Sequence, residues 1–485
     1  MTVQKRSSRP KSGAASGKMP GGKSPGGKSP GGKPGPRRPG PRRKPADRTP
    51  GLGARRAAVA VLTAVLKERQ SLDDALTAEQ EVNGTLSRLA PRDRGFARMI
   101  AATTLRRHGQ ITNILGQFLD KPLPEKSGNA PFVLMAAAAE LLFLEVAPHA
   151  TVSACVALAK SDKNARHFAG LINAILRRIS TEGPALRDAQ DATALNTPAW
   201  MLESWTSAYG EETARAIAAA HLTEAPLDLS VLSEAEGWAE RLSGTVLPTG
   251  SVRLTEGGRV DQLDGFKEGQ WWVQDAAAAL PARLFGDVAG KQVLDLCAAP
   301  GGKTLELAAA GADVTALDRS ARRLVRVTHN LKRMQLTARV ITADALTWKP
   351  DEAAAPAPFV LLDAPCSATG TIRRHPDIPV LKRPGDLAKL VEQQEKLLER
   401  AASLTAPGGL LIYCTCSLEP QEGERQIEKF LATHPDFARA PLSPDDLPGL
   451  PEAITAKGDM RTLPTFWADR GGMDGFFAAR LKRTT

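Results

Sequence analysis

The stretch VLDLCAAPGGKT (residues 293–304) decides the fold class of this chain. A short apolar run predicts a buried strand, a turn of small residues follows it, and an Ala/Leu-rich segment after Lys303 predicts a helix. Small residues let the backbone approach a ligand closely, and free N–H groups at a helix N-terminus can bind a carboxylate or phosphate. A Walker loop would need a further glycine at a fixed spacing before its Gly-Lys-Thr, and this stretch has none there. The turn therefore predicts a ligand site, and a nucleoside triphosphate is disfavoured as its ligand.

The same strand, turn and helix rhythm continues from residue 276 to residue 485. Short β-rich runs lie at 292–296, 313–317, 339–342, 359–362 and 409–413, separated by helical segments. This alternation predicts a doubly wound, Rossmann-like α/β domain with a mostly parallel sheet. Ligands of such domains lie at the carboxyl ends of the strands.

Acidic residues stand at three of these strand ends. Asp318 follows the second strand, where an acid suits the ribose hydroxyls of a nucleoside cofactor, by the logic of dinucleotide folds. Asp344 ends the third strand, in position to meet the adenine edge, and Asp363 ends the fourth. A single acid is more often a surface or capping residue. Three of them beside a Gly-rich turn indicate a nucleoside-containing cofactor.

Two cysteines follow the fourth and fifth strands, which are neighbours in the proposed sheet. Asp363-Ala-Pro-Cys366 and Thr415-Cys416-Ser417 would share one cleft. A thiolate that adds to carbon 6 of a cytosine makes carbon 5 nucleophilic towards a methyl sulfonium, and Asp363 could assist at ring N3. The residues alone leave the nucleophile open, because DNA cytosine-5 methyltransferases attack with a Pro-Cys cysteine, which would point to Cys366.

The alternative for the pair Cys414 and Cys416 is a metal site. Alternate residues of a strand point to opposite faces, so these two thiols could not share a metal while the strand is extended. The chain has seven histidines, and none of them forms a ligand cluster near this strand. We therefore expect no metal, and we interpret Cys414 as a packing residue.

Two further regions precede this domain. Residues 51–190 have helical periodicity, and Ala58, Val61, Leu62, Val65 and Leu66 mark one apolar face. Further helices are predicted at 91–108, 110–118, 131–146, 151–160 and 165–179. Residues 195–275 mix helix and strand signals, which suggests a small α+β module. The cations at helix ends, such as Arg106 and Arg107, are interpreted as solvated.

Residues 1–50 are a low-complexity basic tail. They hold fourteen Lys and Arg and one acid, whereas residues 51–485 hold 50 basic and 52 acidic residues. Such a segment cannot bury enough apolar surface to offset its chain entropy, so we expect a disordered arm. It could tether RNA phosphates or merely solubilise the chain; a transit peptide is disfavoured by its Gly-Pro breaks.

The remaining composition predicts a cytoplasmic protein that does not enter a membrane. The longest apolar stretch, residues 131–139, stops at Glu140, far short of the ~20 residues that span a bilayer. The five cysteines show no paired framework of the secreted kind. We expect a monomer.

Taken together, the motifs resemble the Sun/Fmu family of bacterial ribosomal RNA cytosine-5 methyltransferases. Residues 297–304, 363–366, 415–417 and the Gly-Gly-Met-Asp-Gly-Phe-Phe run at 471–477 match that family's motifs. Residues 52–185 resemble its NusB-type helical RNA-binding domain, and 195–275 occupy the place of its RNA-recognition-like module. The resemblance implies methyl transfer from S-adenosylmethionine to carbon 5 of a cytosine in small-subunit (16S) ribosomal RNA.

The resemblance also assigns the site. It makes Cys416 the nucleophile and gives Cys366 a part in eliminating the covalent adduct. It implies that S-adenosylmethionine is bound by Cys297, Ala298, Ala299, Pro300, Gly301, Gly302, Lys303, Asp318, Asp344 and Asp363.

Two departures from the family pattern lie where RNA contact is expected. The chain has Ser230-Val231-Leu232 where the family often has Arg-x-Asn, and Pro379 where an aromatic residue is common. These positions put the details of substrate contact in doubt. The rival functions are the same chemistry on transfer RNA or another RNA, and a non-catalytic RNA-binding antitermination or assembly factor.

Overall fold

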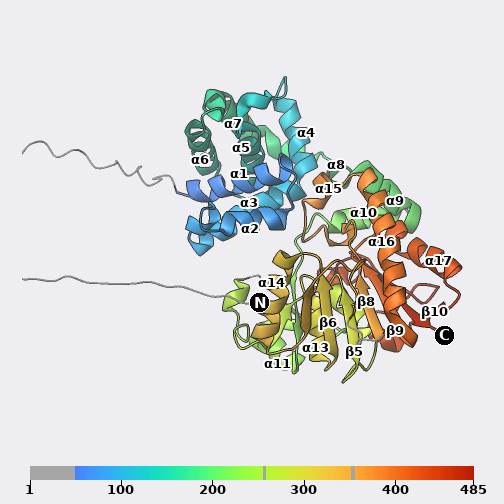
Figure 1. Cartoon of the computed structure of the whole chain (residues 1–485). Coiled ribbons are helices and arrows are strands. Elements are labelled where there is room, and N and C mark those ends of the chain that lie inside the picture. The colour runs from blue at the N-terminus through green and yellow to red at the C-terminus, as the bar shows by residue number, and fades with distance from the viewer. Residues whose placement is uncertain (1–49, 255–257, 351–355, 485) are drawn as a thin grey trace, which may run out of the picture. The chain divides into compact units, whose positions relative to one another are not determined.

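The computed structural model describes residues 50–254, 258–350 and 356–484 (Figure 1). The basic tail predicted at 1–50 lies outside the described residues except for Pro50. Within those ranges, no helix combines the length and the apolar character needed to cross a bilayer.

The first part of the described chain is helical, as predicted. α1 buries Ala58, Val61, Leu62 and Val65 in the core of this part. An ion pair crosses that core, because Arg55 Nε donates to Glu140 Oε1 at 3.0 Å and both side chains are buried. Two details differ from the prediction: α2 was not expected, and the last helix runs to Asp188. The helices are α1 (Leu52–Leu66), α2 (Leu72–Gln80), α3 (Pro91–Arg106), α4 (His108–Phe118), α5 (Ala130–Phe143), α6 (Pro148–Ser161) and α7 (Ala169–Asp188).

A small α+β module follows, again as predicted. Its sheet has the order β2-β3-β1-β4, with antiparallel pairing throughout. Trp238 of α11 packs beside Trp271 of β4 in the core of this module. Its elements are α8 (Ala192–Asn196), α9 (Ala199–Tyr209), α10 (Glu211–Ala220), β1 (Leu227–Val231), α11 (Ala235–Arg241), β2 (Gly244–Val246), β3 (Val252–Leu254) and β4 (Trp271–Val273).

The C-terminal part is the predicted doubly wound sheet. Its strands have the order β10-β12-β9-β8-β5-β6-β7, with β11 paired to β12. The five predicted strands are present and mutually parallel: β5 (Gln292–Leu296), β6 (Asp313–Asp318), β7 (Arg339–Thr342), β8 (Ala357–Asp363) and β9 (Thr405–Thr415). The sequence did not predict the antiparallel strands β10 (Phe437–Arg439), β11 (Met460–Thr462) and β12 (Phe476–Arg483).

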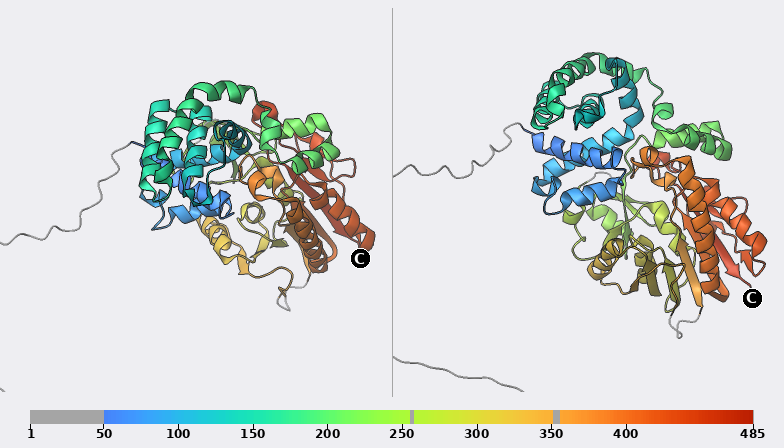
Figure 2. Two further views of the ribbon diagram at one scale, coloured as in Figure 1. Left: turned by 90° about the horizontal axis from the view of Figure 1, so that it is seen from above. Right: turned by 45° about the horizontal axis from the view of Figure 1, so that its top comes forward.

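Helices cover both faces of this sheet (Figure 2). α13 (Gly302–Ala309) contacts α14 (Ala321–Met334), with α12 (Ala276–Arg283) beside α13. α16 (Pro384–Leu404) contacts α17 (Glu424–Thr433), and the short α15 (Ile378–Leu381) precedes them. The crossovers change direction between β5 and β8, so the carboxyl ends of these two strands border the crevice where such folds bind ligands.

Candidate functional site

The turn after β5 has the backbone that its small residues allow. Gly301 has a φ of 104°, and a Cβ at this position would lie 3.1 Å from the Val327 side chain. Glycine is the residue that adopts this conformation without strain. Cys297 also has a positive φ, of 62°, and is partly exposed. The turn therefore presents its backbone to the carboxyl edge of the sheet, and α13 begins directly after it.

Asp318 and Asp344 lie together at this edge, as predicted. The buried Asp318 accepts hydrogen bonds from Ala299 N at 3.2 Å and Ser320 N at 2.8 Å. A carboxylate so placed keeps lone pairs for ribose hydroxyls. One cavity holds both acids; its lining includes Cys297, Asp318, Asp344, Pro365, Gln393 and Leu397. Two carboxylates, free backbone groups and an apolar wall fit a nucleoside cofactor.

Lys303 connects the turn to β8, the neighbouring strand in the sheet. Its Nζ donates to Asp363 Oδ2 at 2.8 Å and lies 4.8 Å from the centre of the Phe476 ring. Burial alone would lower the pKa of Lys303, but the charge and hydrogen bond of Asp363, together with Cys414 and Cys416, outweigh burial and raise that pKa. Lys303 therefore stays charged and fixes the Asp363 carboxylate in the cleft.

The two predicted cysteines meet at the ends of β8 and β9. Their Sγ atoms are 3.4 Å apart, and both side chains are partly exposed. The hydrogen bond to Cys416, together with burial, raises the pKa of Cys366 well above its usual value. The two thiols therefore form one hydrogen-bonded pair, in which Cys366 keeps its proton.

Cys414 has a different environment. It is fully buried and its Sγ lies 3.6 Å from Asp363 Oδ1. Burial raises the pKa of this thiol well above its usual value. A buried neutral thiol is a packing group, in agreement with its predicted role. Across the described ranges, no cluster of His, Cys, Asp or Glu is placed to hold a metal ion.

A buried carboxylate that the sequence did not single out holds the segments after both cysteines. Glu422 accepts hydrogen bonds from Ser367 N at 2.9 Å and from Ser417 Oγ at 2.6 Å. The two serine hydroxyls lie 3.0 Å apart, and Gln394 Nε2 also donates to Glu422 at 2.9 Å. Each serine directly follows a cysteine in the chain. Glu422 therefore fixes the distance between the two thiols.

The loop after Cys366 passes close to the motif at 471–477. Gly370 N donates to Cys416 O at 3.0 Å, and Gly475 N donates to Gly370 O at 2.8 Å. A Cβ on Gly370 would lie 1.9 Å from Gly475 O, so only glycine fits. This contact explains why Gly370 and Gly475 are glycines, and it joins the Cys366 loop to the motif at 471–477 at the thiol side of the cleft.

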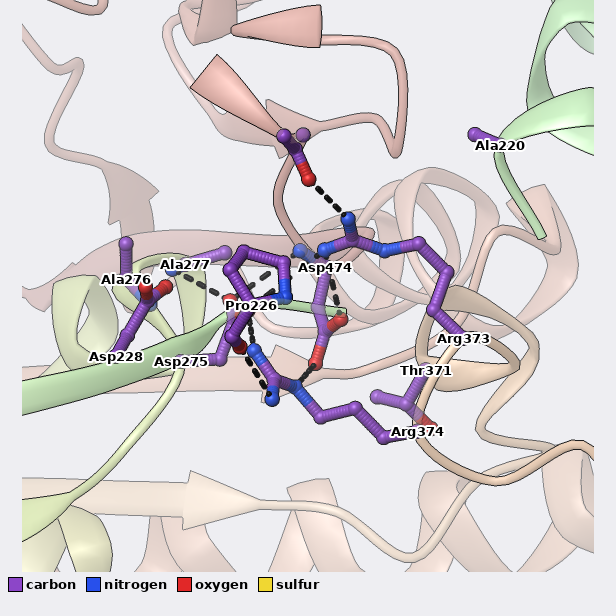
Figure 3. A network of polar contacts seen from close by, with 12 residues as sticks. Ala220, Pro226, Asp228, Asp275, Ala276, Ala277, Thr371, Arg373, Arg374 and Asp474 are labelled. Atoms are coloured by element: carbon purple, nitrogen blue, oxygen red, sulfur yellow. Dashed lines mark hydrogen bonds and ion pairs between the residues drawn. The ribbon is translucent and has the colours of Figure 1, made fainter. Parts of the chain in front are cut away.

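A buried ionic network anchors the same loop (Figure 3). Arg374 donates to Asp474 Oδ2 at 3.0 Å and to Asp275 Oδ2 at 2.6 Å, while Arg373 donates to Gly471 O at 2.7 Å. Burial raises the pKa of Asp474 to about 6, although the two arginines lower it. The network ties the Cys366 loop to the C-terminal motif and to the strand that enters α12.

The network continues into the small module and the helical part. Arg253 of β3 donates to both oxygens of Asp228, each at 2.7 Å, and to Gly472 O at 2.7 Å. Arg106 Nη2 donates to Arg373 O at 2.9 Å. The interpretation of Arg106 as a solvated helix end is therefore wrong: its guanidinium satisfies a backbone carbonyl of the Cys366 loop.

Comparison with known proteins gives the family. The model of 16S rRNA methyltransferase RsmB/F matches residues 284–482, and that of the NusB family matches 52–181. Ribosomal RNA small subunit methyltransferase B of Vibrio cholerae is 35% identical, over 89% of this chain and 98% of its own length. The chain belongs to the RsmB/F family of 16S rRNA methyltransferases. The protein of that name from Pseudomonas putida is also 35% identical over 98% of its length.

Solved structures agree on the fold of the RsmB/F chain. The crystal structure of PH0851 has a TM-score of 0.70 at 24% identity and covers 89% of this chain and 98% of its own. NSun6 from Pyrococcus horikoshii, solved with SFG, has a TM-score of 0.51 at 18% identity and covers 59% of this chain and 98% of its own. Family membership confirms the predicted family, fold class, enzyme class and cofactor: the chain is an S-adenosylmethionine-dependent RNA methyltransferase.

The residue assignments and domain limits stay predictions. The structure brings Cys297, Asp318 and Asp344 to the lining of one cavity, whereas residues 298–303 of the turn are not part of that lining. It brings Asp363, Cys366 and Cys416 to the neighbouring strand ends. Sequence reasoning missed Glu422 and the ionic network. The only signal for Glu422 was an acid shortly after Thr415-Cys416-Ser417, and acids near a helix start are usually caps.

Proposed function

We propose that this RsmB/F chain methylates carbon 5 of one cytosine in small-subunit ribosomal RNA through a covalent adduct with Cys416. The observation that carries the proposal is the pair of thiols 3.4 Å apart, beside the Lys303–Asp363 ion pair and the acid-lined cavity. Two thiols and a fixed carboxylate at one cleft suit a reaction that both adds and eliminates a nucleophile.

The turn at 297–303 and the carboxylates of Asp318 and Asp344 would hold S-adenosylmethionine. When bound, the cofactor supplies an electrophilic methyl group on a sulfonium. The backbone of the turn and the two acids fix the nucleoside part, and Pro365 on the cavity lining places the Cys366 loop against it. A cofactor held there would supply its methyl group next to the strand ends that carry Asp363, Cys366 and Cys416.

Cys416 starts the reaction by adding its thiolate to carbon 6, which forms an S–C bond and moves electron density to carbon 5. Carbon 5 then accepts the methyl group. The proton on carbon 5 then passes to solvent water, its electron pair regenerates the ring double bond, and the S–C bond breaks with its electron pair returning to Cys416. The raised pKa of Cys366 keeps its proton in the resting site, so its thiol can donate a hydrogen bond to the Cys416 thiolate.

The neighbouring groups position these reactants. Asp363, held by Lys303, can accept a hydrogen bond from ring N3 once that nitrogen is protonated. Glu422 acts as a positioning residue, because it bonds the segments that follow both cysteines. In this assignment Cys366 helps to release the product. The monomeric state and the cytoplasmic location stay predictions.

The test is methyl transfer to purified RNA. Protein, labelled S-adenosylmethionine and unmodified 16S rRNA should yield one cytosine that resists bisulfite conversion, whereas transfer RNA in a parallel reaction should stay unlabelled. If only transfer RNA became labelled, the substrate would be transfer RNA and not 16S rRNA. Failure to bind labelled S-adenosylmethionine at all would favour the non-catalytic RNA-binding factor.

A further inference from the structure

The exposed face of α14 has a charge pattern unlike the rest of the folded chain. Residues 319–343 contain seven Lys and Arg and no Asp or Glu, whereas the remainder of 51–485 has 43 basic and 52 acidic residues. The helix buries Leu324, Val327, Leu331 and Met334. Arg322, Arg326 and Lys332 lie on its exposed side, with Arg319 just before its N-cap. We call these four residues the basic face.

This arrangement works against the stability of the helix itself. Arg322 and Arg326 are four residues apart, and like charges at that spacing destabilise a helix by about 0.2–0.5 kcal/mol. The first turn has no acid and carries Arg322 and Arg323, although a helix N-terminus favours negative charge. Folding alone gives no reason to keep these cations together here.

Other surface helices of the same chain balance their cations. Lys396 of α16 lies 2.7 Å from Glu392, and Arg178 of α7 lies 3.0 Å from Glu182, both at the favourable four-residue spacing. α14 has no acid of its own with which to form such a pair. The contrast within one chain indicates that the charge of α14 serves something outside the helix.

Part of the charge on and before α14 has structural partners. Arg333 donates to Phe266 O at 2.7 Å and to Trp271 O at 3.0 Å, and it stacks on the Phe266 ring. Arg323 lies 3.6 Å from Asp318 Oδ2. Arg322 contacts Asp74 while its side chain is 67% exposed. These interactions engage one member of the basic face and leave most of its charge directed to solvent.

The position of the basic face suits an extended anion. Arg319 belongs to the lining of the cofactor cavity, next to Asp318. From there α14 carries cations away from the carboxyl edge of the sheet, and Arg322 to Lys332 span about 15 Å along the helix axis. A single phosphate needs no such length, whereas a nucleic-acid backbone presents successive phosphates over it.

We propose that the basic face of α14 binds the phosphate backbone of the RNA substrate, outside the nucleotide that is methylated. The inference rests on the proposed function for its ligand class. Its interactions with RNA are sequence-independent: they add affinity and set the path of the RNA, while the choice of cytosine is made elsewhere. The basic face then contributes to RNA affinity and to its salt dependence, and not to the chemical step.

The test compares two double variants of the full chain with the same change in charge. Arg326→Glu with Lys332→Glu reverses the charge of two of the four members of the basic face and leaves Arg319 and Arg323, which line the cofactor cavity, unchanged. Lys389→Glu with Arg425→Glu makes the matched control on α16 and α17, where both cations are exposed. Binding to 16S rRNA is measured over a salt series, together with KM, kcat and the affinity for labelled S-adenosylmethionine.

For the α14 variant we expect a several-fold higher KM for RNA. The salt slope should fall by about one for each phosphate that the variant no longer neutralises. Its kcat and cofactor affinity should match the wild type, and the control variant should keep the wild-type slope. Arg326→Gln with Lys332→Gln should show a smaller increase in KM and a smaller fall in the salt slope. If the Glu variant fails to bind the cofactor, this Gln variant tests the proposal in its place.

An α14 variant with the salt slope and KM of the wild type would overturn the proposal and leave the basic face as a solvated surface. An equal loss of RNA affinity in the control variant would show that the effect comes from the net charge of the protein, and this result would also overturn the proposal. If the wild type bound RNA but methylated none, the proposed function would fail, while the salt slopes would still judge the basic face on their own.

Discussion

The two sides of the cleft are built in different ways. The cofactor side uses a turn, a helix start and acids at consecutive strand ends, all close in sequence to their own strands. The thiol side joins the ends of β8 and β9 through Glu422, which lies shortly after β9, and through Gln394, Gly475 and the ionic network, which come from other parts of the chain. Lys303 and Asp363 connect the sides.

This difference separates binding from positioning. Backbone groups in a short turn can hold a cofactor with little help from remote residues. Two thiols must be held close to the correct separation, and a reacting group misplaced by about 1 Å can cost roughly 10²-fold in rate. The thiol side therefore needs a buried polar scaffold, and changes to that scaffold should affect kcat more than cofactor affinity.

The largest effect short of removing a thiol is expected where the two sides meet. Asp363→Ala should lower kcat by about 10²–10⁴-fold, because it removes the group that assists at ring N3. Lys303→Met should also lower kcat, because it leaves the Asp363 carboxylate without its cation. Single-turnover methyl transfer measures both. A wild-type kcat in the Asp363→Ala variant would show that Asp363 takes no part in the chemical step.

Glu422→Gln should come next, with a fall in kcat of roughly 10²-fold. Glutamine keeps the size but replaces one of the two acceptor oxygens by a donor. Either Oε1, which accepts from Ser367 N and Gln394 Nε2, or Oε2, which accepts from Ser417 Oγ, is then lost as an acceptor. Labelled S-adenosylmethionine should still bind with its normal affinity, which distinguishes misplaced thiols from a misfolded domain. Glu428→Gln on the exposed part of α17 is the matched control. Equal losses of kcat and cofactor affinity in Glu422→Gln would speak for a general structural role.

The smallest effect concerns the cofactor side and appears in stability. Asp295 of β5 is fully buried; Thr304 donates to its Oδ2 at 2.6 Å, and Oδ1 has no hydrogen-bond partner among the described residues. Burial raises its pKa to about 7. Between about pH 4 and pH 7 the folded state keeps a proton that the unfolded state, with a pKa near 3.9, has lost.

Asp295 therefore contributes stability that is complete below about pH 4 and is lost as the pH rises towards 7, on the order of a few kcal/mol. Asp295→Asn should flatten the dependence of the free energy of unfolding on pH over that window, as denaturant titrations of the protein without ligand would measure. An unchanged slope in the variant would show that this carboxyl is ionised in the folded protein.

The two sides also differ in what the sequence could predict. Local signals indicated the β5 turn, Asp318, Asp344 and both cysteines, because each follows a short apolar strand and parallel strands align their carboxyl ends. Residue chemistry alone left Cys366 and Cys416 equivalent. The resemblance ranked them, and that ranking stays a prediction.

The scaffold of the thiol side had no comparable signal. Glu422, Arg373 and Asp474 are charged residues in loops, which are ordinarily exposed. Arg373 and Asp474 are buried here because β12 returns antiparallel to β9 and brings the motif at 471–477 against the Cys366 loop. Glu422 is buried where Gln394 meets the serines that follow the two cysteines. Long-range pairing of this kind has no local periodicity, so the antiparallel strands and the network they create escaped prediction together.

The most direct test of this account is adduct trapping with the two cysteine variants. RNA and S-adenosylmethionine are incubated with Cys366→Ala or Cys416→Ala protein, and denaturing gels report the fraction of protein bound covalently to RNA. Cys366→Ala should accumulate a denaturation-resistant adduct, and Cys416→Ala should neither methylate nor crosslink. An adduct in the Cys416→Ala protein would contradict the account and make Cys366 the nucleophile.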